Sequence, residues 1–522
     1  HKTREQTKHM DSKKVYDLFI IGGGINGCGV AADAAGRGLN VYLAEQNDLA
    51  SGTSSASSKL IHGGLRYLEH YEFRLVKEAL AEREVLLSKA PHLVSPLKFT
   101  LPHRPHLRPS WMIRAGLFMY DHLSKRNSLP SAKSVPLGMA AGLKPDIQKG
   151  FEYYDCWVDD ARLVVNNAID AAERGATIKT GVRCEAANYV KEKQQWVISC
   201  TNLADGDSYK VHAKHIINAA GPWMRRVIDK GVPQLKASRG IRLIKGSHLI
   251  VPRVPNGDSA YILQNEDRRI VFVLPYLDDY SVIGTTDKEY TGPLDEIKID
   301  DDEIKYLISV HNQHFLHELK VSDIVATYSG VRPLCDDESN DPSAITRDYT
   351  IDTQSLGANA FISIYGGKIT TYRKLASAVL EELRTFEPTL PREWTKSTPL
   401  PGCAFFGETR NEISKSLSAR FPWLSKDLIS RYASSYGHLS ERFLAQKESM
   451  EELGQDFGYG LTEQEVNYLI NHEWARTADD VLFRRTKVGY HFNNKQIENL
   501  ESYIEKRIRP DARPSSLLES AV

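Results

Sequence analysis

The glycine-rich stretch near the amino terminus constrains the fold more than any other part of the chain. An apolar run ends at Ile21 and leads into a G-x-G-x-x-G pattern formed by Gly22, Gly24 and Gly27, with Asn26 in the turn. In a strand–turn–helix unit such glycines allow a tight turn, close approach of the backbone to a pyrophosphate, and close packing of helix on strand. The helix N-terminus offers unpaired N–H groups and a positive dipole end to the phosphates. We therefore predict a dinucleotide site here.

The second strand of this unit narrows the choice of dinucleotide. Residues 41–44 are apolar, and Glu45 stands at the tip of this strand, where its carboxylate can accept hydrogen bonds from an adenosine ribose. An acid at this position argues against a 2′-phosphate. The pattern therefore favours NAD or FAD over NADP.

Two later strands also run into small residues. Residues 215–223 form an apolar strand that ends in alanine and glycine, which leaves room beside a nucleotide and points to FAD over NAD. Residues 361–373 read as a strand, a double-glycine turn and a helix start, which again offers N–H groups to an anion. The cofactor contacts that we expect from these two turns are Ala220, Gly221, Gly366, Gly367, Lys368 and Thr370.

A serine-rich segment, residues 49–64, follows directly on the dinucleotide strand. Its composition is also typical of a flexible polar linker. It ends, however, in a His-Gly-Gly turn before a helix predicted from Arg66 to about Ser88. We expect hydroxyl and N–H groups here to contact the pyrophosphate and the flavin ring; the residues concerned are Thr53, Ser54, Ser58, Lys59, His62, Gly63 and Gly64.

Length and composition limit the class of protein. At 522 residues the chain is expected to form two or three domains. Lys+Arg and Asp+Glu are both 67, so nothing global suggests nucleic acid. The mean hydropathy is −0.40, and the apolar runs are too short for a spanning helix, so the chain is not expected to cross a membrane.

The cysteines and the amino terminus bear on the compartment. None of the six cysteines has C-x-x-C spacing, so we expect reduced thiols and no metal site. Without a signal-peptide pattern, the compartment reads as cytoplasmic. Residues 1–9 are polar and patternless and read as an expression leader before Met10.

Residues 92–145 differ in character from the rest of the chain. They contain eight Lys and Arg residues but one acid, Asp121. An apolar helix is predicted from Ser110, which could act as its N-cap, and it carries Trp111 and Phe118. A cationic, Trp-bearing apolar helix is typical of a segment that lies in a bilayer interface. The alternative is a core helix with a solvated basic rim.

The order of the elements gives a domain plan. We predict an FAD-binding domain over 10–239 that includes the basic segment 92–145, a substrate domain of antiparallel strands over 240–328, and a return to the FAD-binding domain over 329–387. A proline-rich linker, 388–402, precedes a helical domain over 403–522, with helices predicted at 440–453 and elsewhere. Capping boxes are expected at Thr462-x-x-Glu465 and, more loosely, at Thr477-x-x-Asp480.

Seven stretches together resemble a known family, the FAD-dependent, membrane-associated glycerol-3-phosphate dehydrogenases of aerobic bacteria. They are GGGINGCG, TSSASSKLIHGGLRYLE, GFEYYDCWVDDARLV, NAAGPW, IRLIKGSH, SGVRPL and YGGKITTYRKLA. The resemblance runs from about Tyr16 to near Arg507. It implies an α/β fold: a glutathione-reductase-like FAD-binding domain with an inserted antiparallel-sheet substrate domain and a C-terminal helical domain.

The resemblance also implies an activity and partners. The expected reaction is oxidation of sn-glycerol 3-phosphate to dihydroxyacetone phosphate, with electrons passed through FAD to ubiquinone. The expected location is the cytoplasmic face of the inner membrane, where the protein is peripheral or monotopic and binds an anionic membrane surface. A homodimer is the expected assembly.

The chemistry requires a base for the hydroxyl proton and cations for the phosphate. Histidine is suited to the first role because its pKa lies near the working pH. His248 matches the family's GSH motif and is the candidate base, although a hydrogen-bonded core histidine is the alternative and His62 is a rival. Arg332, placed in a loop between strands, is the candidate for clamping phosphate or steadying a developing alkoxide, against the alternative of a surface ion pair. Arg66 and Lys368 are further expected substrate contacts, and Lys368 could instead lie near the flavin N1.

Three other readings stay open. A soluble α-glycerophosphate oxidase would use the same fold and substrate with oxygen as acceptor. An amine oxidase of the same superfamily would need fewer cations than this chain provides. A non-catalytic flavin-binding or membrane-scaffold protein would not need the base, cation and flavin motifs together.

Overall fold

The structure is a computed structural model of the chain. It describes residues 14–69, 72–124, 127–236, 240–255, 258–336 and 348–508. The residues predicted as an expression leader lie outside these ranges.

Eight strands of the described chain form the first sheet. Their order is β17-β18-β10-β1-β2-β7, with β9 paired to β10 and β8 to β9. They are β1 (Val15–Ile21), β2 (Val41–Glu45), β7 (Thr177–Thr180), β8 (Val182–Val190), β9 (Gln195–Asn202), β10 (Ser208–Asn218), β17 (Thr350–Leu356) and β18 (Asn359–Tyr365). β1 pairs in parallel with both β2 and β10, and its buried apolar run follows from having strands on both sides.

Ten strands of the described chain form the second sheet. Their order is β15-β11-β14-β13-β12-β4-β6-β3, with β16 paired to β11 and β5 to β6. They are β3 (Leu60–Ile61), β4 (Val94–Pro102), β5 (Lys133–Pro136), β6 (Lys149–Val158), β11 (Ile241–Pro252), β12 (Ala260–Gln264), β13 (Ile270–Tyr276), β14 (Tyr280–Gly284), β15 (Lys288–Glu289) and β16 (Ala326–Cys335). The pairing of β12 with β4 is parallel, whereas β11, β13, β14 and β16 pair in antiparallel fashion.

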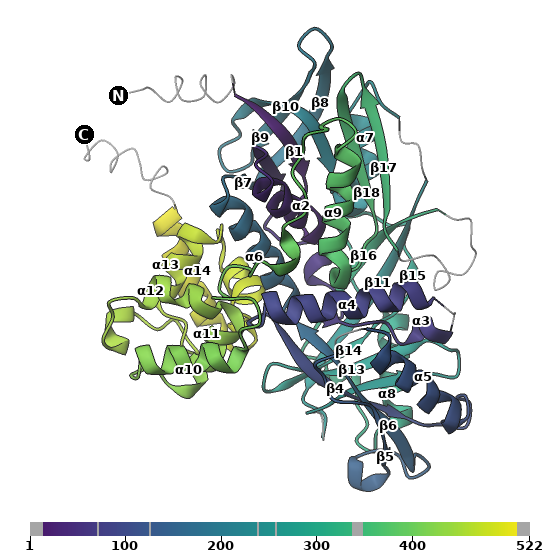
Figure 1. Ribbon diagram of the computed structural model, residues 1–522. Coiled ribbons are helices and arrows are strands. Elements are labelled where there is room, and N and C mark those ends of the chain that lie inside the picture. The colour runs from purple at the N-terminus through teal and green to yellow at the C-terminus, as the bar shows by residue number, and fades with distance from the viewer. Residues whose placement is uncertain are drawn as a thin grey trace.

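Helices cover the first sheet and form a separate body at the carboxyl end of the described chain. Three helices lie against the first sheet: α2 (Ile25–Gly36), α6 (Asp160–Glu173) and α9 (Tyr372–Leu383). A fourth, α4 (Phe73–Lys89), runs between the two sheets (Figure 1). The other helices are α3 (Arg66–Glu69), α5 (Ser110–His122), α7 (Met224–Gly231), α8 (Asp301–His314), α10 (Arg410–Arg420), α11 (Lys426–Ser435), α12 (Glu441–Leu444), α13 (Glu463–His472) and α14 (Asn494–Ile508). The predicted three-part architecture is confirmed.

The second sheet extends beyond the range predicted for the substrate domain, 240–328. Strands β3, β4, β5 and β6 come from residues 60–158, which we assigned to the FAD-binding domain. β16 continues to Cys335, so Arg332 lies within a strand and not in a loop. Pro333 lies in β16, which pairs with β11 on one side, and proline within sheets is found on edge strands of this kind.

Several local predictions were wrong. The helix predicted from Arg66 to about Ser88 is divided into α3 and α4. The helix predicted over 440–453 is reduced to α12 and a short 3-10 turn. Pro109, not Ser110, is the residue before α5.

The two predicted capping boxes have opposite outcomes. The first does not form: the hydroxyl of Thr462 has no hydrogen-bond partner in the described chain. The carboxylate of Glu465 is instead bound by Arg431 at 2.6 and 2.7 Å and by the Tyr436 hydroxyl. The looser box forms: Thr477 and Asp480 each accept the other's backbone N–H at 3.1 Å.

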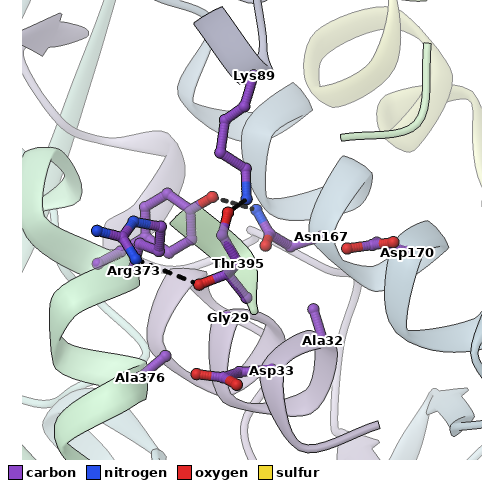
Figure 2. A pocket seen from close by; sticks show the side chains of 10 residues that line it. Gly29, Ala32, Asp33, Lys89, Asn167, Asp170, Arg373, Ala376 and Thr395 are labelled. Carbon is purple, nitrogen blue, oxygen red and sulfur yellow. Dashed lines mark hydrogen bonds between the residues drawn. The ribbon is translucent and has the colours of Figure 1, made fainter. Parts of the chain in front are cut away.

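Polar contacts hold the predicted linker, 388–402, against α4 and α9. Lys89 donates to the backbone oxygen of Thr395 at 2.6 Å, and Arg373 donates to its hydroxyl at 3.3 Å. Figure 2 shows these side chains around a pocket of about 10 Å³ between α2, α4, α6 and α9. That is room for a single water molecule, so the pocket belongs to the packing of the linker rather than to a ligand site.

Two further observations concern the whole of the described chain. None of its helices combines the length and apolar character that crossing a membrane requires. Its six cysteines are all unpaired, as predicted.

Candidate active site

A cavity of about 1210 Å³ lies where the two sheets meet. Ligand pockets commonly measure about 300–1,000 Å³, so this one has room for a dinucleotide together with a small substrate. The carboxyl ends of β1, β2, β10 and β18 open into it, which is where open α/β sheets bind their ligands. On the opposite side it is lined by β11, β13 and β16 of the second sheet.

The glycine turn has the close approaches that a dinucleotide turn requires. A Cβ on Gly22, whose φ is +112°, would lie 2.2 Å from the backbone oxygen of Ala219. A Cβ on Gly27 would lie 1.9 Å from the backbone oxygen of Gly22. Gly22 and Gly24 line the cavity, whereas Gly27 lies behind them in the contact between helix and strand.

Asn26 and Glu45 both line the cavity. The Asn26 side chain donates to the backbone oxygen of Gly366 at 3.0 Å, and its own oxygen is buried without a partner in the described chain. One oxygen of Glu45 accepts the N–H of Gly23 at 2.8 Å and the other accepts that of Asn47 at 2.8 Å. These bonds fix the carboxylate at the tip of β2, where the ribose contact is predicted.

The serine-rich segment is bound on both sides and is not a loose linker. The Thr53 hydroxyl donates to the backbone oxygen of Val331 at 2.6 Å, and the Ser54 hydroxyl accepts the N–H of Ile25 at 2.9 Å. Thr53, Ser54 and Ser58 line the cavity.

Lys59 also lines the cavity, but its ammonium group is engaged within the protein. It donates to Asp160 at 2.9 and 3.1 Å and to the backbone oxygen of Ser55. Burial lowers the pKa of Lys59, and Asp160 opposes that shift. We therefore infer that Lys59 holds the serine-rich segment in place and does not bind the charge of a ligand.

The His-Gly-Gly turn faces the cavity with two of its three residues. His62 and Gly64 line it, and the N–H of His62 donates to the Thr370 hydroxyl at 3.2 Å. Gly63 lies behind, where its N–H donates to the Tyr120 hydroxyl at 2.8 Å. Burial lowers the pKa of His62, which favours its neutral form.

His248 lies on β11 and is 2 % exposed. Its Nε2 is 2.9 Å from the Ser58 hydroxyl, and its Nδ1 is buried without a partner in the described chain. The ring stacks on Tyr328, with centroids 4.6 Å apart, and a Cβ on Gly284 would lie 2.1 Å from it. The histidine is therefore tightly positioned, and Nε2 is the nitrogen on the side of Ser58, which shares the cavity wall.

The pKa of His248 is lower than the near-neutral value expected for a general base. Burial, together with the positive charges of Lys59 and Arg332, lowers the pKa of His248 to about 3. The ring is thus neutral at neutral pH and able to accept a proton. A dianionic ligand would offset the two cations and raise this pKa.

Arg332 lies four residues along β16 from Tyr328, so both side chains belong to the same face of the sheet. The Arg332 side chain is 30% exposed, and its guanidinium lies 3.1 Å from the carboxylate of Asp287. Both residues line the cavity, so the ion pair stands inside the site and not on the outer surface.

The remaining predicted residues come together at the same place. Arg66, Lys368, Ala220, Gly221, Gly366 and Gly367 all line the cavity. The ammonium group of Lys368 lies 3.9 Å from the centre of the Tyr67 ring, which is a cation–π contact.

Four residues illustrate what sequence reasoning missed in this site. They are Tyr67, Gly284, Thr285 and Asp287; Tyr67, Thr285 and Asp287 line the cavity, and Gly284 makes room for the His248 ring. Tyr67 lies within the long motif that ends in GLRYLE, so its place in that motif could have identified it as a site residue. Asp287 follows a strand with nothing in the local pattern to distinguish it from a surface acid.

The residues present fit an FAD molecule. Gly22, Gly23 and Gly24 line the cavity without side chains, which leaves room for a pyrophosphate, and the buried oxygen of Asn26 has no partner in the described chain. The cavity continues from the ribose side to His62 and His248. The cavity thus has a nucleotide site at the parallel sheet and charged side chains at the second sheet. This arrangement is that of a flavoprotein oxidoreductase built on two sheets.

Comparison with known proteins agrees with this class. Residues 17–373 match the family model "FAD dependent oxidoreductase", and residues 393–505 match "C-terminal domain of alpha-glycerophosphate oxidase". The chain is 53% identical over 489 residues to the aerobic glycerol-3-phosphate dehydrogenase of Escherichia coli, covering 94% of this chain and 97% of that one. It is 46% identical over 490 residues to the D-erythritol 1-phosphate dehydrogenase of Brucella abortus, covering 93% and 97%.

A solved structure shares the fold. The glycerol-3-phosphate dehydrogenase of Bacillus halodurans, complexed with FAD, superposes with a TM-score of 0.71 at 24% identity, covering 97% of each chain. The chain therefore belongs to the family of FAD-dependent oxidoreductases that includes the aerobic glycerol-3-phosphate dehydrogenases of bacteria, and its cofactor is FAD.

Proposed function

We propose that the protein oxidises sn-glycerol 3-phosphate to dihydroxyacetone phosphate and passes the electrons to ubiquinone at the cytoplasmic face of the inner membrane. The observation that carries the substrate class is the grouping of Arg332, Arg66 and Lys368 in one cavity with His248. Three cations suit a dianionic phosphate, and the buried histidine suits the neighbouring hydroxyl. The relative from Escherichia coli supports the same substrate.

The roles follow from the positions of the side chains. The lining of the cavity would hold FAD, which would supply the acceptor for the hydride that leaves C2 of the substrate. His248 takes the hydroxyl proton, with the stacked Tyr328 ring holding the imidazole in place, and His62 is the alternative base. Arg332, which is held by its ion pair with Asp287, binds the phosphate or stabilises the developing alkoxide. Arg66 and Lys368 supply further positive charge for the phosphate.

The membrane part of the proposal rests on α5. Its inner face, with Leu117 and Tyr120, packs into the core of the second sheet. Its outer face exposes Trp111, Phe118 and Met119, at 69%, 65% and 42%. This helix is thus both a core helix and an exposed apolar surface, and large exposed apolar groups beside basic residues favour an anionic bilayer interface.

The basic residues around α5 differ in how far their side chains are exposed and available to contact a membrane. Arg104 is 14% exposed and lies 3.9 Å from Glu266, so it is largely committed within the protein. Arg114 is exposed and donates to the Ser134 hydroxyl at 3.0 Å. The apolar residues of α5 therefore make a cleaner test than removal of the basic ones.

Vesicle co-sedimentation tests the membrane part. Trp111→Ser with Phe118→Ser should lower binding to anionic vesicles more than tenfold, since each aromatic group contributes about 1.5–3 kcal/mol on burial. The matched control is Phe405→Ser with Phe406→Ser, a pair exposed by 52% and 40% on the C-terminal part. Equal binding by the two double variants would contradict the proposal.

A second candidate substrate is a longer polyol phosphate, because a relative of similar identity is a D-erythritol 1-phosphate dehydrogenase. Anaerobic mixing of the purified protein with each phosphate should bleach the visible flavin absorbance faster with glycerol 3-phosphate. Faster bleaching by erythritol 1-phosphate would reverse the assignment. Absence of bleaching by either would favour a non-catalytic flavin protein.

The electron acceptor is tested separately from the substrate. With glycerol 3-phosphate, turnover should be supported by a short-chain ubiquinone analogue and should yield little hydrogen peroxide in air. Stoichiometric peroxide without need of a quinone would instead identify an α-glycerophosphate oxidase. Gel filtration with light scattering tests the proposed homodimer.

A further inference from the structure

Three cations of the C-terminal helical part contact the FAD-binding part beside the cavity. They are Arg484 and Arg485, the last two residues of a π-helical turn, Asp480–Arg485, and Lys487, two residues beyond it. Figure 1 shows the C-terminal helices packed beside α6, which carries part of this contact. Within the described chain, no residue beyond Thr370 lines the cavity, so these cations do not touch the ligand site themselves.

The first contact is a buried ion pair with Asp48. Both terminal nitrogens of Arg485 donate to its carboxylate, at 2.7 and 2.9 Å, and Nε of Arg484 donates at 2.7 Å. Arg485 is fully buried, and the Asp48 side chain is 6% exposed. Burial alone would raise the pKa of Asp48, but the two guanidinium groups outweigh it and hold that pKa below its ordinary value.

Asp48 stands in the turn that leads away from Glu45. Two residues further on, the N–H of Ala50 donates to the backbone oxygen of Gly23 at 3.0 Å, while the N–H of Gly23 donates to Glu45 at 2.8 Å. The turn over residues 46–51 is therefore hydrogen-bonded to the glycine turn. Its residues, apart from Asp48 and Leu49, line the cavity.

The second contact reaches the other side of the site. Lys487 forms an ion pair with Asp159, the N-cap residue of α6. The next residue, Asp160, accepts from the Ser57 hydroxyl at 2.8 Å, and the backbone oxygen of Ser57 accepts the Tyr328 hydroxyl at 2.9 Å. Tyr328 is the ring that stacks on His248.

We propose that Arg484, Arg485 and Lys487 are positioning residues for FAD. They fix the 46–51 turn and the start of α6 from outside, so that the groups lining the nucleotide side of the cavity are held in their binding positions before the cofactor enters. Binding is tighter when the contacting groups are locked by a supporting layer of buried polar contacts. The C-terminal helical part thus serves cofactor retention, although it supplies no residue to the described cavity wall.

The rate of FAD release from the holoenzyme tests this proposal. Asp48→Asn removes the carboxylate charge and keeps the shape of the side chain. After dilution, the rise in free flavin fluorescence should be about tenfold faster than in the unchanged protein, which corresponds to about 1.4 kcal/mol. Far-UV circular dichroism at the same temperature shows that the variant is folded.

The matched control is Glu465→Gln, which breaks a buried Arg–carboxylate pair with Arg431 inside the C-terminal part. Breaking either pair leaves a buried charge uncompensated and lowers stability. FAD release should remain within about twofold of the unchanged protein in this control. Release from D48N that is no faster than from E465Q would overturn the proposal, because the effect would then be general destabilisation.

A milder variant covers the case in which D48N does not fold. Arg484→Gln leaves the Asp48–Arg485 pair intact, and faster release than from E465Q would support the proposal, whereas equal release would overturn it. The measurement follows FAD alone, so it is independent of the substrate and of the electron acceptor.

Discussion

The two sheets contribute to the same cavity in different ways. The parallel strands of the first sheet present small residues and backbone groups, as at Gly22, where a Cβ would lie 2.2 Å from Ala219. The second sheet presents charged and ring side chains, notably His248 and Arg332. We expect a nucleotide to be held mainly by close approach of the main chain, and the substrate by side-chain charge. We therefore expect mutations in the two sheets to have separable effects on FAD content and on catalysis.

The largest effect is expected at the glycine turn. Gly22→Ala would place a methyl group against a backbone oxygen that cannot move aside, at a φ of +112° that disfavours side chains. The purified variant should lack visible flavin absorbance. The matched control is Gly38→Ala, whose φ is +91° but whose Cβ would meet nothing within 4 Å. If both variants kept their flavin, close approach at Gly22 would not be a requirement for the nucleotide.

The next effect should be on chemistry without loss of cofactor. His248→Ala should slow flavin reduction at least about a hundredfold, as expected for removal of a general base, with FAD content unchanged. Stopped-flow absorbance measures that rate directly. His311→Ala is the control, since His311 is equally buried in the same region but does not line the cavity. Reduction at the normal rate in H248A, together with a loss in His62→Ala, would make His62 the base.

A smaller effect is expected on substrate affinity. Arg332→Ala removes a charge-assisted contact of about 2 kcal/mol, which is about thirtyfold in KM for glycerol 3-phosphate. FAD content should not change. Arg242→Ala is the control: Arg242 lies on the paired strand β11 and contacts Glu289 at 2.8 and 3.0 Å outside the cavity. An unchanged KM in R332A would remove Arg332 from the phosphate site.

The two sheets also differ in how far the sequence predicted them. The nucleotide site is encoded within residues 18–45, so the turn, the helix and Glu45 could be placed from spacing alone. The second sheet joins segments as distant as β4 and β12, whose parallel pairing leaves no local pattern. Only the family resemblance brought His248 and Arg332 together before the structure was known.

Individual side chains were harder to predict than elements, for a physical reason. Lys59 carries a charge beside the site, but Asp160, a residue 101 positions away, binds that charge. The Thr462 capping box has the right residues, but Arg431 and Tyr436 bind the glutamate that would complete it. In both cases a distant partner outcompetes the local interaction that the sequence suggests.

The smallest expected effect is a loss of stability in acid, which should begin in the region of the second sheet. Burial lowers the pKa of His248 to about 3 and the pKa values of His311 and His314 to about 4, from an ordinary value of 6.5. Between those values the unfolded chain binds more protons than the folded one, so stability is full above about pH 6.5 and falls as the pH drops. Each histidine can lower the free energy of unfolding by at most about 1.4 kcal/mol per pH unit.

Thermal unfolding should therefore show a Tm that falls between about pH 7 and pH 5. The fall should be shallower in His311→Gln than in the control His106→Gln, which replaces an exposed histidine in the same part of the chain. Equal slopes in the two variants would show that His311 does not contribute to the acid sensitivity.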